Sequence, residues 1–198
     1  MKRYIKAAIK NMSEEGLDVR RNIAGDPNTR VDVLRDMADT NEYFIQLGLA
    51  TNPNTPQDIL DKFTDFRHYS SNVRAAVASN PSTTKDMLYK LMRPSNPDIY
   101  RAIASNPITP LDLLDEIAHM PSFDFASYGP AKAAIARRND VTEGMLIYLS
   151  CSEDPNVRAW AARNPKTPES TLQRLANDKS WEVRDSVTKN PRFPDLKL

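Results

Sequence analysis

Residues 157–165 read VRAWAARNP, and the stretches VRAAVASNP (73–81) and IYRAIASNP (99–107) repeat the same pattern. Looser copies are VRRNIAGDP (19–27), IQLGLATNP (45–53), AKAAIARRN (131–139) and VRDSVTKNP (183–191). The last residues of successive copies are spaced by 26, 28, 26, 32, 26 and 26 residues. A nearly fixed period of this length is the signature of a repeat array. The sequence therefore predicts stacked copies of one unit, an architecture that generally presents a binding surface.

Each copy predicts one short helix. In the copy at 73–81 the apolar Val73, Ala76 and Val77 follow the i, i+3, i+4 spacing, which places them on one helical face. Asn80 precedes Pro81, and a residue before proline is disfavoured in the α conformation, so the helix is expected to end there. The Asn side chain can also bond its own nearby backbone and stabilise the turn.

A second helix is predicted a few residues after each copy. Thr55-Pro56 and Thr109-Pro110 are expected to place Thr at the N-cap and Pro at the first helical position, and Thr29, Thr83 and Thr167 are expected to cap likewise. Apolar residues then follow on one face of each predicted second helix: Ile59, Leu60 and Phe63; Met87, Leu88 and Leu91; Leu113, Leu114 and Ile117; Met145, Leu146 and Leu149; Leu172 and Leu175. No sustained period-2 alternation competes. The sequence predicts an all-α protein whose unit is a helix pair.

The string V-R-x-x-V-A-x-N-P-x-T-P-x-x-x-L-x-x-L-A, which residues 157–176 fit closely, resembles the variant leucine-rich repeat, a relative in architecture of HEAT and armadillo arrays. The resemblance implies a right-handed α-solenoid of about seven two-helix repeats with half-repeat caps, in a bacterial or phage protein. We expect one solenoid domain over 1–198. Its capping helix is placed at 1–16 and its repeats at roughly 17–40, 41–69, 70–95, 96–128, 129–154, 155–180 and 181–198.

Composition narrows the class of protein. Twenty-seven Lys and Arg against 26 Asp and Glu leave a formal net charge of +1. This net charge does not indicate nucleic acid or an anionic membrane as a partner. No apolar run is long enough to cross a bilayer, so no membrane association is expected. Cys151 is the only cysteine, which excludes an internal disulfide and the cysteine cluster that holds an iron–sulfur centre in some relatives. We expect a cytoplasmic protein without a cofactor.

Basic residues recur in two columns. The first holds Arg20, Arg74, Lys132, Arg158 and Arg184 at one repeat position, broken by Gln46 and Tyr100. It could follow a phosphate backbone or an acidic partner, or it could be a structural ladder bonded to carbonyls and carboxylates of the adjoining unit. The second holds Arg137, Arg163 and Lys189, with Arg138 alongside, whereas residues 26–65 are rich in Asp. This asymmetry indicates either a polarised binding surface or an ordinary mixed-charge exterior.

The two departures from the 26-residue period are both aromatic. Residues 120–130 (MPSFDFASYGP) are predicted to be an inserted loop with Phe123, Phe125 and Tyr128, and residues 63–71 carry Phe66, His68 and Tyr69. Insertions in repeat arrays map to one face that often binds partners, so these rings are candidate contacts; the alternative is that they pack back onto the helices. Trp160, where other copies carry Ala or Ser, either fills a gap near Trp181 or presents an aromatic anchor.

No set of residues with interpretable catalytic spacing is present. His68 and His119 lack metal-ligand spacing and are expected to be exposed between helices, and Cys151 is expected to be partly buried. We therefore predict a non-catalytic scaffold that binds a protein partner, without a metal site. Nucleic-acid binding along the basic columns is the alternative, and an enzyme with a site at the 120–130 insertion is a third. The candidate binding residues are Arg74, Lys132, Arg137, Arg158, Arg163, Arg184, Phe123, Phe125 and Tyr128.

Overall fold

The computed structural model describes residues 14–93, 96–121 and 125–195. Within these residues the chain forms thirteen α-helices, a short 3₁₀ helix η1 (Phe193–Asp195) and no strand. The described chain is therefore all-α, as predicted. It divides between Ile108 and Thr109 into two compact units. Residues 1–13, where most of the capping helix is predicted, lie outside the described residues.

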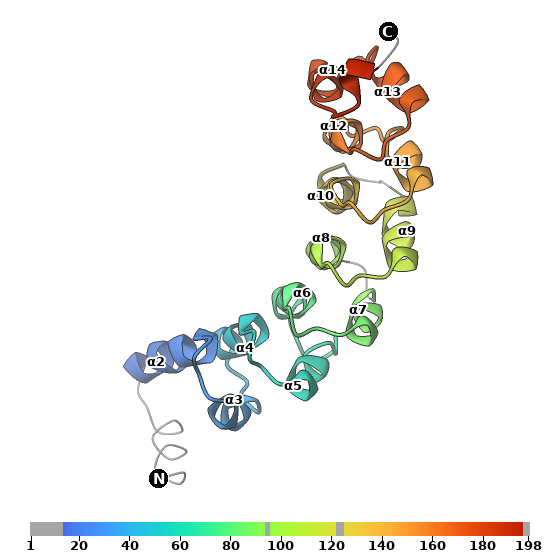
Figure 1. The fold of residues 1–198 in the computed structure, drawn as a ribbon. Helices are drawn as coiled ribbons and strands as arrows, with labels where there is room; N and C mark the ends of the chain where they lie inside the picture. Colours follow the sequence, from blue (N-terminus) through green and yellow to red (C-terminus); the bar gives the residue numbers. More distant parts are fainter. Residues whose placement is uncertain (1–13, 94–95, 122–124, 196–198) are drawn as a thin grey trace. The chain divides into compact units, whose positions relative to one another are not determined.

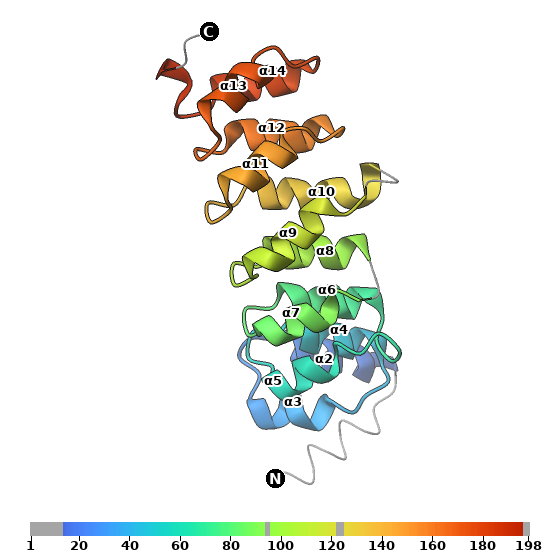
Figure 2. The same cartoon turned by 90° about the vertical axis from the view of Figure 1, so that its right-hand side faces the viewer.

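The N-terminal unit alternates two kinds of helix along the chain (Figure 1, Figure 2). The first helices, which carry the repeated copies, are α2 (Glu14–Gly25), α4 (Tyr43–Thr51), α6 (Ser71–Ser79) and α8 (Pro97–Ser105). The second helices are α3 (Val31–Met37), α5 (Gln57–Lys62) and α7 (Lys85–Leu91). Each first helix packs on the next one, α2 on α4, α4 on α6 and α6 on α8.

The C-terminal unit has the same organisation. Its first helices are α10 (Phe125–Ala136), α12 (Pro155–Arg163) and α14 (Trp181–Thr188), and its second helices are α9 (Leu111–His119), α11 (Glu143–Leu149) and α13 (Glu169–Leu175). Helices α10 and α12 pack together, as do α12 and α14, and α9 packs on α11. Packing between helices two apart in chain order is consistent with a helical repeat array, in which each unit contacts its neighbours.

The second helices bury the apolar residues that the sequence pattern assigns to the core. All of the predicted positions are buried: Ile59, Leu60, Phe63, Met87, Leu88, Leu91, Leu113, Leu114, Ile117, Met145, Leu146, Leu149, Leu172 and Leu175. Helices of seven residues such as α7, α11 and α13 are not stable alone in water. Burying one Leu or Val side chain contributes about 1.5–3 kcal/mol, so packing between repeats is what holds these helices.

The Asn of each Asn-Pro pair that follows a first helix joins consecutive repeats. Asn80 is 2% exposed, and its Nδ2 donates to the carbonyl oxygens of Ala50 and Asn52, 2.8 and 2.9 Å away in the preceding repeat. Its Oδ1 accepts the backbone N–H of Ser82 at 2.8 Å, across the proline. Asn52, Asn106, Asn164 and Asn190 donate in the same way to Ala24, Ala78, Ala136 and Ala162.

This bond explains why the chain repeats Asn. The last carbonyl groups of an α-helix have no partner within the helix, and the Asn amide of the next repeat supplies donors to them. An Asp could accept the bond across the proline but could not donate. Asp26, the one Asp at this position, is exposed and only accepts, from Asn28 N at 2.8 Å and from Asn28 Nδ2 at 3.1 Å.

The predicted N-caps at Thr29, Thr55, Thr83, Thr109 and Thr167 are wrong, because each helix begins one residue later. Helix α5 begins after Pro56, and the Thr55 hydroxyl donates to the Leu49 carbonyl, 2.6 Å away in α4. Thr29, Thr83 and Thr167 bond Ile23, Val77 and Ala161 in the same way. In each of these repeats one further residue (Arg30, Pro56, Thr84 or Pro168) stands at the N-cap between the threonine and the helix, so the hydroxyl instead meets a free carbonyl of the first helix. Without proline the next threonine caps, as Thr84 does by accepting Met87 N–H.

The segment predicted as an inserted loop is largely helical. Helix α10 starts at Phe125 and continues through Pro130, so Phe125 and Tyr128 belong to the helix. Proline was read as the end of the loop, but in a helix it removes one backbone hydrogen bond, and α10 accommodates it. Phe123 lies outside the described residues.

Within the described residues, none of the helices has both the length and the apolar character that crossing a membrane requires.

Candidate functional site

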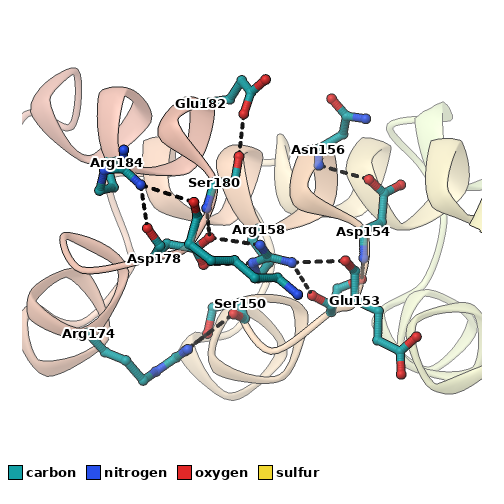
Figure 3. A network of polar contacts seen from close by, with 12 residues as sticks. Ser150, Glu153, Asp154, Asn156, Arg158, Arg174, Asp178, Ser180, Glu182 and Arg184 are labelled. Carbon is teal, nitrogen blue, oxygen red and sulfur yellow. Dashed lines mark hydrogen bonds and ion pairs between the residues drawn. The ribbon is translucent and has the colours of Figure 1, made fainter.

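Arg158 of the first basic column is buried in a polar network (Figure 3). Its Nη1 donates to the carbonyl oxygens of Ser152 and Glu153, each 2.9 Å away. Its Nε and Nη2 donate to the two carboxylate oxygens of Asp178, each 2.7 Å away, and the two side chains are 6% and 9% exposed. The hydrogen bond from Arg158 lowers the pKa of Asp178, and the same bond raises the pKa of Arg158. This ion pair links α12 to the segment that follows α13.

Other residues of the first column also bond carbonyl oxygens in the segment leading into their helix. Arg184 Nη1 donates to Asp178 O at 2.7 Å (Figure 3), and Lys132 Nζ donates to Met120 O at 2.7 Å. The two residues that break the column do the same: Gln46 Nε2 donates to Thr40 O at 2.9 Å, and Tyr100 OH to Met92 O at 3.2 Å. Because the neutral Gln46 and Tyr100 suffice, this position requires a hydrogen-bond donor and not a charge.

Arg74 differs from the rest of its column. Its side chain is buried, and neither Nε nor Nη1 has a hydrogen-bond partner among the described residues. Burial lowers the pKa of the Arg74 guanidinium, and burial likewise lowers the pKa of Lys132. Arg20 is half-buried, and in the described part of the chain its Nε also lacks a partner.

The second basic column lies along the first helices of the C-terminal unit, around Trp160. The guanidinium carbon of Arg137, from α10, is 4.5 Å from the centre of the Trp160 ring. The guanidinium carbon of Arg163, one turn after Trp160 in α12, is 5.2 Å from the centre of the same ring. Both distances are within the range of cation–π attraction. Trp160 is half-buried, so it both packs and presents an edge to solvent.

A pocket of about 360 Å³ lies between α12 and α14 beside this cluster. Its lining residues are Asn156, Ala159, Trp160, Arg163, Trp181, Glu182, Asp185, Ser186 and Lys189. Trp181 is 64% exposed at the start of α14. Lys189 forms an ion pair with Asp185, and the Ser180 hydroxyl donates to Glu182. That hydrogen bond lowers the pKa of Glu182.

The N-terminal unit has a groove at the corresponding place, between α6 and α8. It measures about 440 Å³ and is lined by Thr51, Ala75, Ala76, Ser79, Asn80, Asp98, Arg101, Ala102 and Ser105. Small residues stand where the C-terminal pocket has Trp160 and Arg163. On a first helix of this unit, Phe44 of α4 is 54% exposed, with the guanidinium carbon of Arg21 4.7 Å from its ring centre.

The two aromatic segments belong to different units, and each is described by itself. Tyr128 is half-buried, and the structure describes no side-chain contact of Phe125 or Phe123. In residues 63–71, Phe63 is fully buried and the Tyr69 ring lies 4.8 Å from it, while Phe66 is 54% exposed. The long segment thus packs one ring against the core and leaves another exposed. Bonds from Arg67 hold the pKa of Asp65 well below its ordinary value.

His68 and His119 are exposed, as predicted, although His119 is the last residue of α9 and not part of a connecting segment. Cys151 is exposed, contrary to the prediction of partial burial. Helix α11 ends at Leu149 and Ser150 takes the buried position, so the chain carries Cys151 outward. Among the described residues, no three His, Cys, Asp or Glu side chains are grouped to hold a metal ion.

A second pocket in the C-terminal unit adjoins the 120–130 segment. It measures about 270 Å³ and is lined by Met120, Pro121, Lys132, Tyr148, Leu149, Cys151, Ser152 and Glu153. Three carboxylates of residues 26–65, those of Asp39, Asp58 and Asp61, pair with basic residues of neighbouring second helices. Asp58 bonds Arg35 at 2.6 Å, and Asp61 bonds Lys90 at 2.6 Å. These pairs are exposed to water, which weakens their attraction, so the acidic stretch serves helix-to-helix contacts in part.

Sequence reasoning missed the place of Trp181. It was treated only as a packing neighbour of Trp160, yet it is exposed on the pocket. Its position before the apolar Val183, outside the buried stripe of α14, is the signal that could have found it.

Comparisons of the chain with protein-family models, with curated proteins and with solved structures gave no match. The likeness to the variant leucine-rich repeat thus remains a resemblance in sequence pattern.

Proposed function

We propose that this chain is a non-catalytic scaffold that binds a partner protein through a surface of its first helices. The observation that carries the proposal is the pocket between α12 and α14, where Trp160, Arg163 and the exposed Trp181 lie together. Trp and Arg are the residues most enriched among those that dominate binding at protein interfaces. Trp181 is 64% exposed, so most of its indole is accessible to a partner.

The same proposal takes the chain as a right-handed α-solenoid of the variant leucine-rich repeat type, cytoplasmic and of bacterial or phage origin. Its support is the packing of helices two apart within each unit and the Asn bond that recurs in both units. The sequence period runs through both units, which favours a single array of about seven repeats.

Nucleic-acid binding is less well supported than protein binding. Arg158 and Arg184 of the first column are engaged with carbonyl oxygens, and Arg158 with Asp178 as well, so they are not free to neutralise phosphates. The pocket also carries the carboxylates of Glu182 and Asp185, which repel a polyanion.

The test is affinity capture from a bacterial lysate with the full chain, compared side by side with a Trp181→Ser variant. Phe44→Ser serves as the matched control because it removes an exposed ring of a first helix in the other unit. We expect proteins that are retained by the wild type and by Phe44→Ser to be lost from Trp181→Ser. Identical retention by all three, with unchanged thermal transitions, would contradict binding at this face, and turnover of a substrate without any partner would contradict the scaffold function.

A further inference from the structure

In the C-terminal unit, two arginine side chains lie beside the ring of the same tryptophan. The guanidinium carbons of Arg137 and Arg163 lie 4.5 and 5.2 Å from the centre of the Trp160 ring. Within the described residues, neither forms an ion pair with a carboxylate, whereas Arg158 and Arg138 do. Two cations beside one ring repel each other, and the ring offsets this only in part. An anion bound at Arg163 would be attracted by Arg137 as well.

Arg163 also carries an unused donor. Its Nε is buried and has no hydrogen-bond acceptor among the described residues. Buried donors are nearly always paired in folded proteins, so an unpaired one requires an explanation such as a bound group. Because Arg163 lines the pocket between α12 and α14, a group entering the pocket meets this side chain.

The other charges of the pocket already have partners. Lys189 pairs with Asp185, and the Glu182 carboxylate accepts the Ser180 hydroxyl. The positive charge that a ligand in the pocket can neutralise is therefore at Arg163, on the Trp160 side. Arg137 lies against the Trp160 ring outside the pocket lining and adds positive charge nearby. The carboxylates on the α14 side disfavour a chain of phosphates, while a single carboxylate beside Trp160 avoids them.

We propose that this pocket binds a short acidic peptide segment of a partner protein. An Asp or Glu carboxylate of the segment accepts hydrogen bonds from Arg163 beside Arg137, and a neighbouring aromatic or large apolar side chain packs on Trp181. The volume of about 360 Å³ is at the small end of ligand pockets, which suits a few side chains. The inference rests on the proposed function of protein binding and names the chemistry of the partner.

The test is selection of binders from a random peptide library on the full chain, followed by titration of the enriched peptides. The chain has 2 tryptophans and both line this pocket, so intrinsic fluorescence reports its occupancy. We expect enriched peptides to carry Asp or Glu near an aromatic residue. Changing that acid to its amide should weaken binding by roughly tenfold or more, as expected for a lost hydrogen bond between charged groups.

Arg163→Gln should cause the same loss, and Arg137→Gln, at an exposed residue, repeats the test if the first variant unfolds. Arg101→Gln, in the corresponding groove between α6 and α8, is the control and should change binding by less than about twofold. Enriched peptides without acidic residues, or equal binding by the arginine variants, overturn the inference while leaving partner capture through another surface intact. A selection that enriches nothing overturns it too, as does tighter binding of a single-stranded oligonucleotide at the same arginines.

Discussion

Asn164→Asp tests the bond that joins consecutive repeats. Asn164 is 3% exposed, and its Nδ2 donates to the carbonyl oxygens of Ala136 and Arg138 at 2.7 and 2.8 Å. The substitution keeps the size of the side chain and the Oδ1 acceptor for Lys166 N–H. It replaces the only donor with a second oxygen directed at two carbonyl groups.

The expected loss follows from these contacts. Leaving a buried acceptor without its partner costs about 1–3 kcal/mol, so two carbonyls together cost about 2–6 kcal/mol. For a chain of this size, 1 kcal/mol shifts the thermal midpoint by about 2–4 °C. The midpoint of Asn164→Asp should therefore fall by at least about 4 °C.

Urea unfolding followed by tryptophan fluorescence measures this loss, because Trp160 and Trp181 flank Asn164 on α12 and α14. Asp26→Asn is the matched control: Asp26 is exposed and already lacks the donated bonds, so its stability should change by less than about 0.5 kcal/mol. A loss below about 1 kcal/mol for Asn164→Asp would refute the reasoning, since it would mean that the amide donors do not hold neighbouring repeats together.

Arg158→Met should lower the free energy of unfolding by about 3–5 kcal/mol in urea titration, because it leaves the buried Asp178 carboxylate unpaired; a loss within error would contradict the buried ion pair. The pKa of Asp178 is lowered in the folded state, so the stabilisation from its ionised form is complete above the unfolded value of about 3.9 and is lost as the pH falls through the folded value. The stability difference between the wild type and Asp178→Asn, measured against pH, should shrink accordingly in acid. Arg74→Met should leave the thermal midpoint unchanged or raise it, because an unpaired guanidinium is replaced by an apolar side chain of similar length; a clear fall in the midpoint would show that Arg74 has a stabilising partner. Thr84→Ala should cost about 1 kcal/mol by removing the cap of Met87 N–H, and no change in the urea midpoint would count against that cap.

Much of the fold follows from local patterns. The i, i+3, i+4 spacing and the Asn-Pro pairs predict where the first helices lie and where they stop, and α6 and α12 end directly before Asn80 and Asn164. The apolar stripes of the second helices predict their buried faces. These features depend on the period of the helix and on the conformational limits that proline imposes, both of which act over a few residues.

The candidate site could be predicted only in part. The sequence brought Arg137 and Arg163 into one column, but nothing in their spacing showed that both lie against Trp160. It grouped Arg158 with them as a candidate contact, although Arg158 is buried against Asp178, twenty residues further along the chain. Residues of one column occupy equivalent positions in their helices. Which of them forms a bond within the protein depends on the backbone that lies next to each one.

By itself, the sequence determined the helical class, the two-helix unit, the ends of the first helices and the buried stripe of the second ones, because each is set by interactions between residues close in the chain. Only the tertiary structure decided where the side-chain donors go. The Asn amides reach carbonyls of the preceding repeat, the threonine hydroxyls turn back to the first helix, and Trp181 is left exposed beside Arg163. These outcomes depend on how far one helix stands from the next, and that distance is set by the packing of side chains between repeats.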